Sequence, residues 1–158
     1  MRAFSPFLLA PAALCLAACS ITMDLPQDFL RLEQSGSHYK AVTPDDGRLW
    51  VRSFAQDVEG TPDFWATALK NDLVQNRGYE LVAEKPVKDG AGHQGRLFEF
   101  RAFAGGEKRG YLAAVFAIAG SGWPWSGPRI VLAEFTAPDA VFAERVASVR
   151  ERIGTLVP

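Results

Sequence analysis

Residues 95–119 read GRLFEFRAFAGGEKRGYLAAVFAIA and contain two apolar-rich runs joined by Gly105-Gly106. A pair of glycines between two such runs is a strong signal for a β-hairpin, because the residues of a tight hairpin turn need a positive φ. The second run, residues 108–119, is apolar from Tyr111 onward. A continuous apolar run predicts a central strand that is covered on both faces.

The first run of this hairpin alternates in a way that gives the strand two different faces. Phe98 and Phe100 point to one face, and Leu97 points to the other. Glu99 and Arg101 share the face of Leu97. A buried ion pair is one interpretation of these two residues, but alternation favours exposure to solvent, and we expect the latter.

Further strands are expected on both sides of the hairpin, each bounded by turn residues. The clearest turn is TPDDG at residues 43–47, where proline, aspartate and glycine each suit one position of a tight turn. In the strand after this turn, Trp50 and Phe54 face away from Leu49. The expected strands cover residues 21–25, 29–32, 39–42, 48–54, 79–87 and 128–136.

Two helices are expected from their end signals and their apolar spacing. Thr61 is a suitable N-cap, Pro62 suits the first turn, and Gly78 suits a left-handed C-terminal cap. Phe64 and Trp65 are expected on the buried face of this helix. The helices are expected over residues 62–77 and 138–156.

The order of these elements is β-β-β-α-β-β-β-β-α. Hairpins rather than crossovers join the later strands, which predicts a mostly antiparallel sheet with two main helices packed on it, an α+β sandwich. The chain shows no internal repeat and no low-complexity linker. Residues 24–158 are therefore expected to form a single α+β domain, which is long enough for a real core.

Composition argues against several classes of protein. The chain carries 17 lysines and arginines against 18 aspartates and glutamates, so it has no positive excess to pair with nucleic-acid phosphates. Its two cysteines are Cys15 and Cys19, near the N-terminus. The remaining sequence therefore has no disulfide and no cysteine-rich metal site, and its stability must come from packing.

The first 18 residues have the layout of a secretory signal peptide. Arg2 precedes an apolar run that ends in small residues before Cys19. This run is shorter than the roughly 20 apolar residues that a membrane-spanning helix needs, and Pro11 interrupts it. We expect residues 1–18 to be removed after export.

The end of this leader, Leu16-Ala17-Ala18-Cys19, resembles the lipobox of bacterial lipoproteins. That resemblance implies a diacylglycerol on the sulfur of Cys19, cleavage between Ala18 and Cys19, and residues 19–23 as a lipidated tether. Two or three acyl chains anchor a protein stably, since each buried methylene contributes about 0.8 kcal/mol. Ser20 resembles the default residue for transfer to the outer membrane, which implies its periplasmic face. The alternative is a secreted protein with a chance cysteine.

The arrangement as a whole resembles the PsbP-like fold. The residues that carry this resemblance are Leu25-Pro26, the turn at 43–47, Phe64-Trp65 and Gly78-Tyr79, followed by a meander and a closing helix. PsbP of photosystem II, the Ran-binding Mog proteins and the DcrB-type lipoproteins share this fold. They are mainly accessory or binding proteins, which implies a similar role here, and none of their contact motifs can be matched to residues of this chain.

The residues that could carry chemistry are few. His38 and His93 are both expected in solvated loops without a partner at ligand spacing, whereas a metal site needs three or four convergent donors. The sequence contains no nucleophile elbow and no phosphate-binding or dinucleotide fingerprint. We therefore expect no metal, no cofactor and no catalytic site, and an enzyme is the least favoured of the functions considered.

Trp123-Pro124-Trp125 is the most unusual feature of the sequence, because it lies between glycines in an expected loop. Trp123 and Trp125 are candidates for contact with a partner protein, a glycan or a membrane. The alternative, which we slightly favour, is that they fold back over the core. An envelope binding protein is the expected function. A carrier of a lipid or hydrophobic molecule, with a cavity lined by Phe98, Phe100, Trp123 and Trp125, is the second hypothesis.

Overall fold

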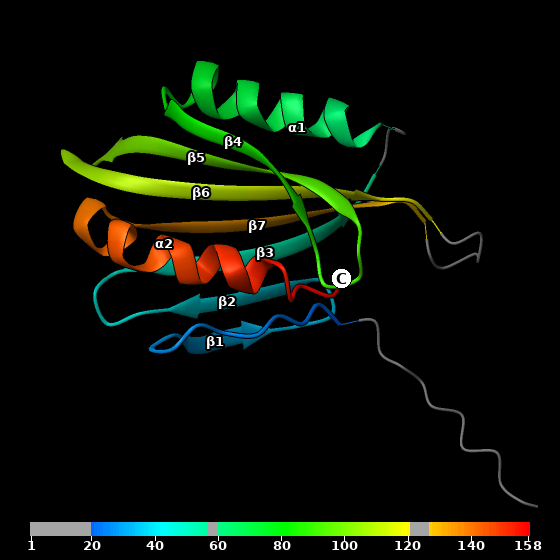
Figure 1. Cartoon of the computed structure of the whole chain (residues 1–158), viewed down its shortest axis with the longest axis horizontal. Coiled ribbons are helices and arrows are strands. Elements are labelled where there is room, and N and C mark those ends of the chain that lie inside the picture. Colours follow the sequence, from blue (N-terminus) through cyan, green and yellow to red (C-terminus); the bar gives the residue numbers. More distant parts are fainter. Residues whose placement is uncertain (1–19, 57–59, 121–126) are drawn as a thin grey trace, which may run out of the picture.

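A computed structural model describes residues 20–56, 60–120 and 127–158 of the chain. In these ranges one seven-stranded sheet has the order β1-β2-β3-β7-β6-β5-β4, and every neighbouring pair is antiparallel (Figure 1). The strands are β1 (Leu30–Gln34), β2 (His38–Val42), β3 (Arg48–Ala55), β4 (Glu80–Lys88), β5 (Gln94–Ala104), β6 (Glu107–Ile118) and β7 (Arg129–Pro138). The helices are α1 (Pro62–Asn71), continued by a π-helical turn η1 (Asp72–Asn76), and α2 (Asp139–Ile153). The expected α+β fold with two helices on an antiparallel sheet is confirmed.

The central hairpin forms as the sequence predicts. β5 and β6 pair along their length, with Phe100 opposite Tyr111, and Gly105 and Gly106 adopt φ angles of 62° and 84°. β6 lies near the middle of the sheet and is buried over most of its length. The hairpin therefore supplies side chains to both faces of the sheet.

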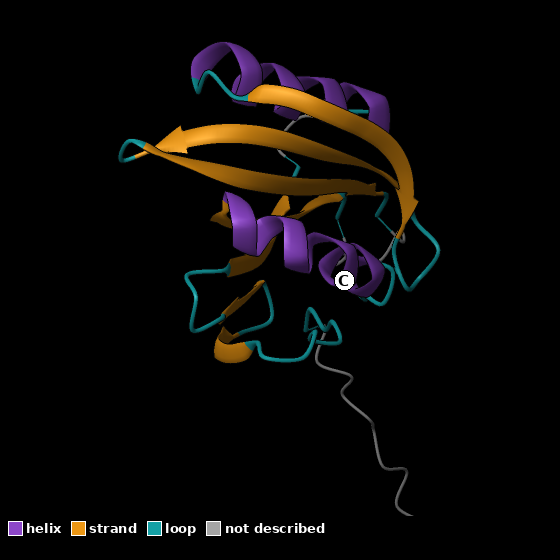
Figure 2. Cartoon of the chain, turned by 60° about the vertical axis from the view of Figure 1, so that its left-hand side comes forward, coloured by secondary structure: helices purple, strands orange, loops and turns teal. Residues whose placement is uncertain are grey.

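The two helices lie on opposite faces of the sheet, which gives three layers (Figure 1 and Figure 2). On one face, α2 covers β6 and β7, and its Val149 and Ile153 are buried there. On the other face, α1 covers β5 and β6, and its Ala66 and the following Leu73 are buried. Because β6 contacts both helices, its alternating side chains are almost all withdrawn from water.

The first helix begins as predicted but buries a different stripe of residues. The Thr61 hydroxyl accepts a hydrogen bond from the Phe64 amide at 3.2 Å, and Gly78 ends the segment with a φ of 69°. The expectation that Phe64 lies in the core is wrong, because its side chain is 54% exposed. Ala66 and Leu73 are buried instead, against side chains of β5 and β6.

The closing helix is shorter than predicted. It ends at Ile153, and the chain after it turns so that Val157 forms an antiparallel bridge with Thr22. The exposure expected for Glu99 is also wrong: its side chain is only 16% exposed, and its carboxylate pairs with Arg150 of α2. The alternation of side chains along β5 is as predicted, but α2 covers the face of the sheet that carries Glu99.

The N-terminal segment joins the core earlier than expected. Residues 21–25 form no regular strand, and only Thr22 makes a β-bridge. Ile21 and Met23 are 1% and 4% exposed, although the sequence placed them in a tether. The packed part of the chain therefore begins at Ile21.

Both edges of the sheet carry irregularities. The register shifts between Arg31 and Glu33 in β1 and between Leu81 and Ala83 in β4, and β4 also contains Pro86. Bulges and prolines on edge strands discourage pairing with strands of other molecules. These features disfavour the addition of a further strand at either edge of the sheet.

Candidate functional site

Helix α1 leaves part of its face of the sheet uncovered. It contacts β5 and β6, so the outward side chains of β1, β2 and β3 on the same face remain accessible to solvent. We call this surface the open half of the sheet. Its exposed apolar residues are Leu30, Leu32, Trp50 and Phe54, with exposed fractions of 66%, 56%, 38% and 45%.

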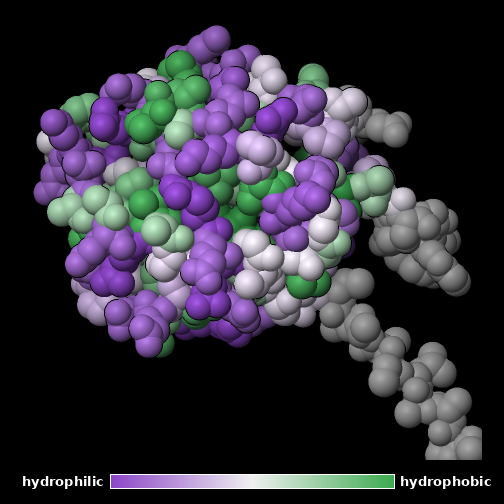
Figure 3. All heavy atoms as spheres, in the orientation of Figure 1, coloured by the Kyte–Doolittle hydropathy of each residue, from purple (hydrophilic) through white to green (hydrophobic). Residues whose placement is uncertain are grey.

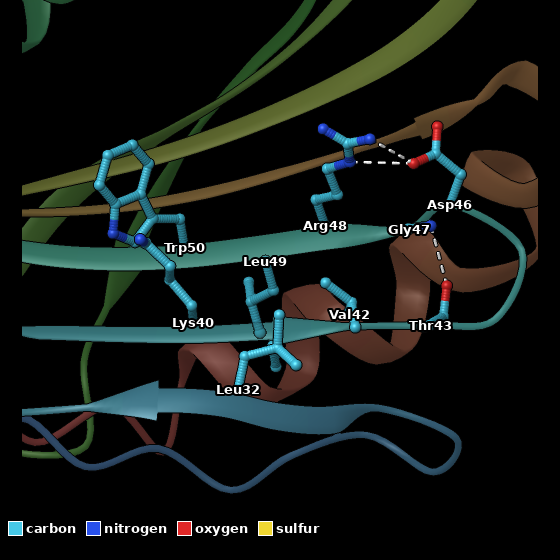
Figure 4. Close-up of a pocket in the computed structure, with 10 residues that line it drawn as sticks. Leu32, Lys40, Val42, Thr43, Asp46, Gly47, Arg48, Leu49 and Trp50 are labelled. Atoms are coloured by element: carbon cyan, nitrogen blue, oxygen red, sulfur yellow. Dashed lines mark hydrogen bonds and ion pairs between the residues drawn. The ribbon is translucent and has the colours of Figure 1, made fainter.

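A groove of about 480 Å³ lies over β2 and β3 on the open half of the sheet (Figure 4). Trp50 and Lys40 lie together at one end of the groove, and the ion pair of Arg48 with Asp46 lies at the other. Its lining consists of Leu32, Lys40, Ala41, Val42, Thr43, Asp46, Gly47, Arg48, Leu49 and Trp50.

Two cations hold the indole ring of Trp50. The Arg52 guanidinium carbon lies 4.0 Å from the ring centroid, and the Lys40 ammonium nitrogen lies 5.2 Å from it. A cation over an indole face is attracted by the negative π surface. These contacts restrict the rotamers of Trp50, so that a large aromatic side chain is presented at the surface with little conformational freedom left to lose.

The two cations that contact Trp50 are each neutralised by a carboxylate. Lys40 pairs with Glu33 at 2.9 Å, and Arg52 pairs with Glu134. The hydrogen bond from Lys40 lowers the pKa of Glu33, which keeps this carboxylate ionised. The open half therefore combines apolar area with balanced ion pairs, which suits a partner without strong net charge better than a polyanion.

A buried tyrosine supports this arrangement from below. The Tyr111 hydroxyl donates a hydrogen bond to Glu134, which in turn accepts one from Arg52. Burial raises the pKa of Tyr111 above its ordinary value, so the hydroxyl keeps its proton and remains a donor. This chain of contacts fixes the guanidinium that lies over Trp50.

The turn at residues 43–47 closes the far end of the groove. The Gly47 amide donates to the Thr43 hydroxyl oxygen at 2.9 Å, and the Thr43 hydroxyl donates to Asp45. Asp45 also accepts from Arg145 of α2 at 2.7 Å, and Asp46 accepts from Arg109 of β6 at 2.8 Å. The predicted turn is confirmed, and Asp46 adopts the left-handed conformation in it with a φ of 65°. The two carboxylates accept from side chains, however, and connect the turn to two distant elements.

Stability is expected to fall in acid because of these two aspartates. Hydrogen bonds from Thr43 and Arg145 lower the pKa of Asp45, and those from Arg109 and Arg48 lower the pKa of Asp46. A lowered pKa in the folded state stabilises the protein above the unfolded pKa of about 3.9, and this contribution is lost as the pH falls below that value.

Urea unfolding at pH 7 and at pH 3 measures this effect. We expect Asp45→Asn to lower the free energy of unfolding at pH 7 and to leave a smaller difference between the two pH values than in the unsubstituted protein. An equal pH dependence in both proteins would contradict the assignment. Asp63→Asn is a suitable control because that side chain is 81% exposed and pairs with Arg96 of β5 rather than with a residue of the turn.

The candidate site residues expected from the sequence lie either outside the described residues or in the core. Ala18, Cys19, Trp123 and Trp125 lie outside the described residues. Phe98 and Phe100 are fully buried beneath α1. The hypothesis of an apolar cavity lined by Phe98, Phe100, Trp123 and Trp125 therefore stays a prediction. The two phenylalanines are packed in the core.

The two histidines are not free loop residues. His38 is the first residue of β2, because the Ser35-Gly36-Ser37 turn ends one residue earlier than expected, and its Nδ1 lies 2.8 Å from the Ser35 hydroxyl. His93 is in a loop, but its Nδ1 lies 2.7 Å from the buried Asp89 carboxylate. Among the described residues, no group of three or more histidine, cysteine and acidic side chains could hold a metal ion.

Trp50 is not among the candidate site residues expected from the sequence, although its strand face was predicted correctly. The available signal was the alternation of Trp50, Arg52 and Phe54 opposite buried Leu49 and Val51. Apolar exposure alone does not single out this surface, since hydrophobic patches separated by hydrophilic side chains also appear on the α2 side (Figure 3). What distinguishes the open half is Trp50, whose ring contacts Lys40 and Arg52 beside the groove. Each of these cations is itself in an ion pair with a carboxylate.

Comparisons with known proteins show the fold. No protein-family model and no curated protein matches the sequence. The chain is similar in structure to LpqN, which is involved in cell envelope biogenesis of Mycobacterium tuberculosis, with a TM-score of 0.64 and 16% identity over 87% of this chain and 83% of that chain. It is also similar to PA94 of Pseudomonas aeruginosa, a protein of unknown function, with a TM-score of 0.56 and 15% identity over 87% of this chain and 96% of that chain.

Proposed function

We propose that this chain is a lipid-anchored, non-catalytic binding protein of the bacterial cell envelope that holds its partner on the open half of the sheet. One observation carries the proposal: Trp50 is 38% exposed and fixed by Lys40 and Arg52 beside a groove of about 480 Å³. Fixed aromatic side chains next to arginine are typical of the residues that dominate binding energy at interfaces.

The location rests on the N-terminal sequence. Residues 1–18 have the layout of a signal peptide, and Cys19 lies where the lipobox places its lipidated cysteine. Ser20 favours the periplasmic face of the outer membrane. The likeness to LpqN supports an envelope protein by its fold, and the resemblance to PsbP-like accessory proteins belongs to the same proposal.

A binding role fits the chemistry of the groove better than catalysis. Its only hydroxyl, that of Thr43, is already bonded to Asp45 and the Gly47 amide. Its cations Lys40 and Arg48 are in ion pairs. Nucleophilic catalysis needs a nucleophile within hydrogen-bond reach of a base and accessible to substrate, and the lining residues do not supply that arrangement.

A carrier of a small hydrophobic molecule is the second candidate. The groove volume falls in the range of about 300–1,000 Å³ that is usual for small-molecule sites, and Leu32, Val42 and Trp50 give it apolar walls. Native mass spectrometry of protein purified from its host distinguishes this function. A bound mass that Trp50→Ala removes supports a carrier, and an unliganded mass from gentle preparations opposes it.

Crosslinking in the native envelope tests the binding proposal. A photoreactive amino acid at Val42, in the groove, is expected to give a discrete crosslinked product. Trp50→Ala is expected to weaken binding by about 2 kcal/mol or more, which is about 30-fold in affinity, because truncating an interface tryptophan commonly has this effect. The crosslinked product should decrease accordingly.

The control position is Phe103, which is 69% exposed on β5 and lies outside the groove. A photoreactive residue there is expected to give no product that depends on Trp50. If both positions gave the same products, or if Trp50→Ala left the Val42 product unchanged, the open half would not be the binding surface.

A further inference from the structure

We infer that the domain stands directly on the bilayer, with one defined end against the lipid headgroups and the groove held above them. This inference rests on the lipid anchor proposed above. We call the surface in question the tether end. It consists of residues 20–22, the turn at residues 35–37, the turn at residues 89–93 and residues 155–158.

The first observation is that almost no free chain separates the anchor from the core. Ile21 is 1% exposed, and Thr22 exchanges two backbone hydrogen bonds with Val157 at 2.9 and 2.8 Å. The Asp24 amide also donates to the Thr155 hydroxyl at 3.0 Å. Two residues from Cys19 to Ile21 span at most about 7 Å. The packed domain therefore cannot leave the headgroup region while Cys19 carries lipid.

The second observation is that two hairpin turns lie beside the anchored segment. The Gln34 side chain donates to the Ile21 carbonyl oxygen at 3.1 Å, which places the turn at residues 35–37 next to it. The Gly90 amide donates to the Leu156 carbonyl oxygen at 2.7 Å, which places the turn at residues 89–93 on its other side. The tether end is thus a continuous surface around the point of attachment.

The third observation concerns the chemistry of these turns. They read Ser-Gly-Ser and Asp-Gly-Ala-Gly-His, so their side chains are mostly small. The one carboxylate, that of Asp89, is buried and accepts hydrogen bonds from the Ala91 and His93 amides at 3.0 and 2.8 Å. Turns without an exposed carboxylate can approach anionic phospholipid without strong repulsion.

An orientation follows from the strand directions. β2 begins at His38 by the tether end and runs away from it to Val42, and the turn at residues 43–47 lies at the opposite end (Figure 1). At about 3.3 Å per residue, Val42 is about 13 Å farther from the tether end than His38. The sheet therefore stands on the bilayer, and the groove faces sideways above the headgroups, where a partner on the same membrane can reach it.

Quenching of site-specific probes by spin-labelled lipid tests this orientation. The protein is purified with its lipid from its host and placed in phosphatidylethanolamine–phosphatidylglycerol vesicles with nitroxide headgroups. A fluorophore is attached at Ala91→Cys in the tether end or at Ala104→Cys at the opposite end, both exposed positions. Lipid blocks the thiol of Cys19, so each engineered cysteine reacts alone.

We expect the probe at Ala91 to be quenched several-fold more strongly than the probe at Ala104. Insertion of 20 glycine and serine residues between Ser20 and Ile21 should reduce the quenching at Ala91 to the level at Ala104, because such a linker reaches about 25 Å on average. Equal quenching at both positions with the natural tether would overturn the orientation.

The mass of the N-terminal peptide separates this inference from the anchor proposal. A peptide that begins at Cys19 and carries diacylglycerol, combined with equal quenching of the two probes, overturns the orientation alone. An unmodified Cys19 in protein that does not bind vesicles overturns both the anchor and the orientation.

Discussion

Replacement of Cys19 by serine is expected to move the protein from the membrane fraction almost completely into the soluble fraction. The serine hydroxyl is a much weaker nucleophile than a cysteine thiolate and would not receive the diacylglycerol. Each acyl methylene contributes about 0.8 kcal/mol, so the loss of two or three chains removes nearly all membrane affinity. No helix in residues 20–56, 60–120 and 127–158 is long and apolar enough to span a membrane in its place. Fractionation of host cells, followed by immunoblotting, measures the change.

The matched control is Cys15→Ser, which alters the other cysteine of the chain, within the proposed leader. It is expected to leave the protein with the membranes. If Cys19→Ser protein continued to sediment with vesicles after a carbonate wash, the lipid anchor would be refuted.

Gly110→Ala is expected to give the largest loss of stability from a single added methyl group. A Cβ at Gly110 would lie 2.0 Å from Cγ and 2.2 Å from Cδ1 of Phe142, a distance that no packed pair of carbons adopts. The Phe142 ring stacks on Phe135, with centroids 5.6 Å apart and planes 13° apart, so it cannot move away freely. Overpacking of this kind costs about 1–3 kcal/mol in the free energy of unfolding. Urea denaturation measures this loss.

Two controls make this prediction specific. Gly127→Ala adds the same methyl group where nothing lies within 4 Å, and we expect little change. Gly110→Ala combined with Phe142→Ala should cost less than the sum of the two single changes, because the ring that obstructs the methyl group is gone. If the losses in the free energy of unfolding were additive, steric overlap with the Phe142 ring would not be the cause of the destabilisation.

Much of the fold could be predicted from local signals. The glycine pair at 105–106 fixes a hairpin, the turn at residues 43–47 has a residue suited to each position, and Thr61 and Gly78 mark the two ends of the first helical segment. These features depend on backbone geometry that a few residues determine. The antiparallel α+β architecture followed from their order along the chain.

The coverage of the sheet could not be predicted in the same way. Alternation divides a strand into two faces, but it does not say which face a helix will cover or how far along the sheet. Glu99 was expected in solvent because the position of α2 was unknown, and it pairs with Arg150. Phe64 was expected in the core because its spacing fits a buried stripe, yet it is 54% exposed.

The candidate site could not be predicted for the same reason, since it depends on which part of the sheet a helix covers. Trp50 and Phe54 stand on a face that would be core if α1 extended over β3, and surface if it did not. Because α1 packs over β5 and β6 and not over β3, Trp50 lies at the surface, where it is a candidate binding residue. The turn aspartates could be assigned locally, whereas their partners Arg109 and Arg145 are 63 and 100 residues away from them in the sequence.

The measurement that tests the binding surface most directly is thiol footprinting in the envelope. Val42→Cys in the groove is labelled with a small maleimide in isolated envelopes and in purified lipidated protein, and Phe103→Cys is treated in parallel. We predict that Val42→Cys reacts several-fold more slowly in envelopes than in purified protein, that Trp50→Ala removes this protection, and that Phe103→Cys reacts equally in both. Equal labelling of Val42→Cys in envelopes and in purified protein would contradict a partner bound on the open half of the sheet.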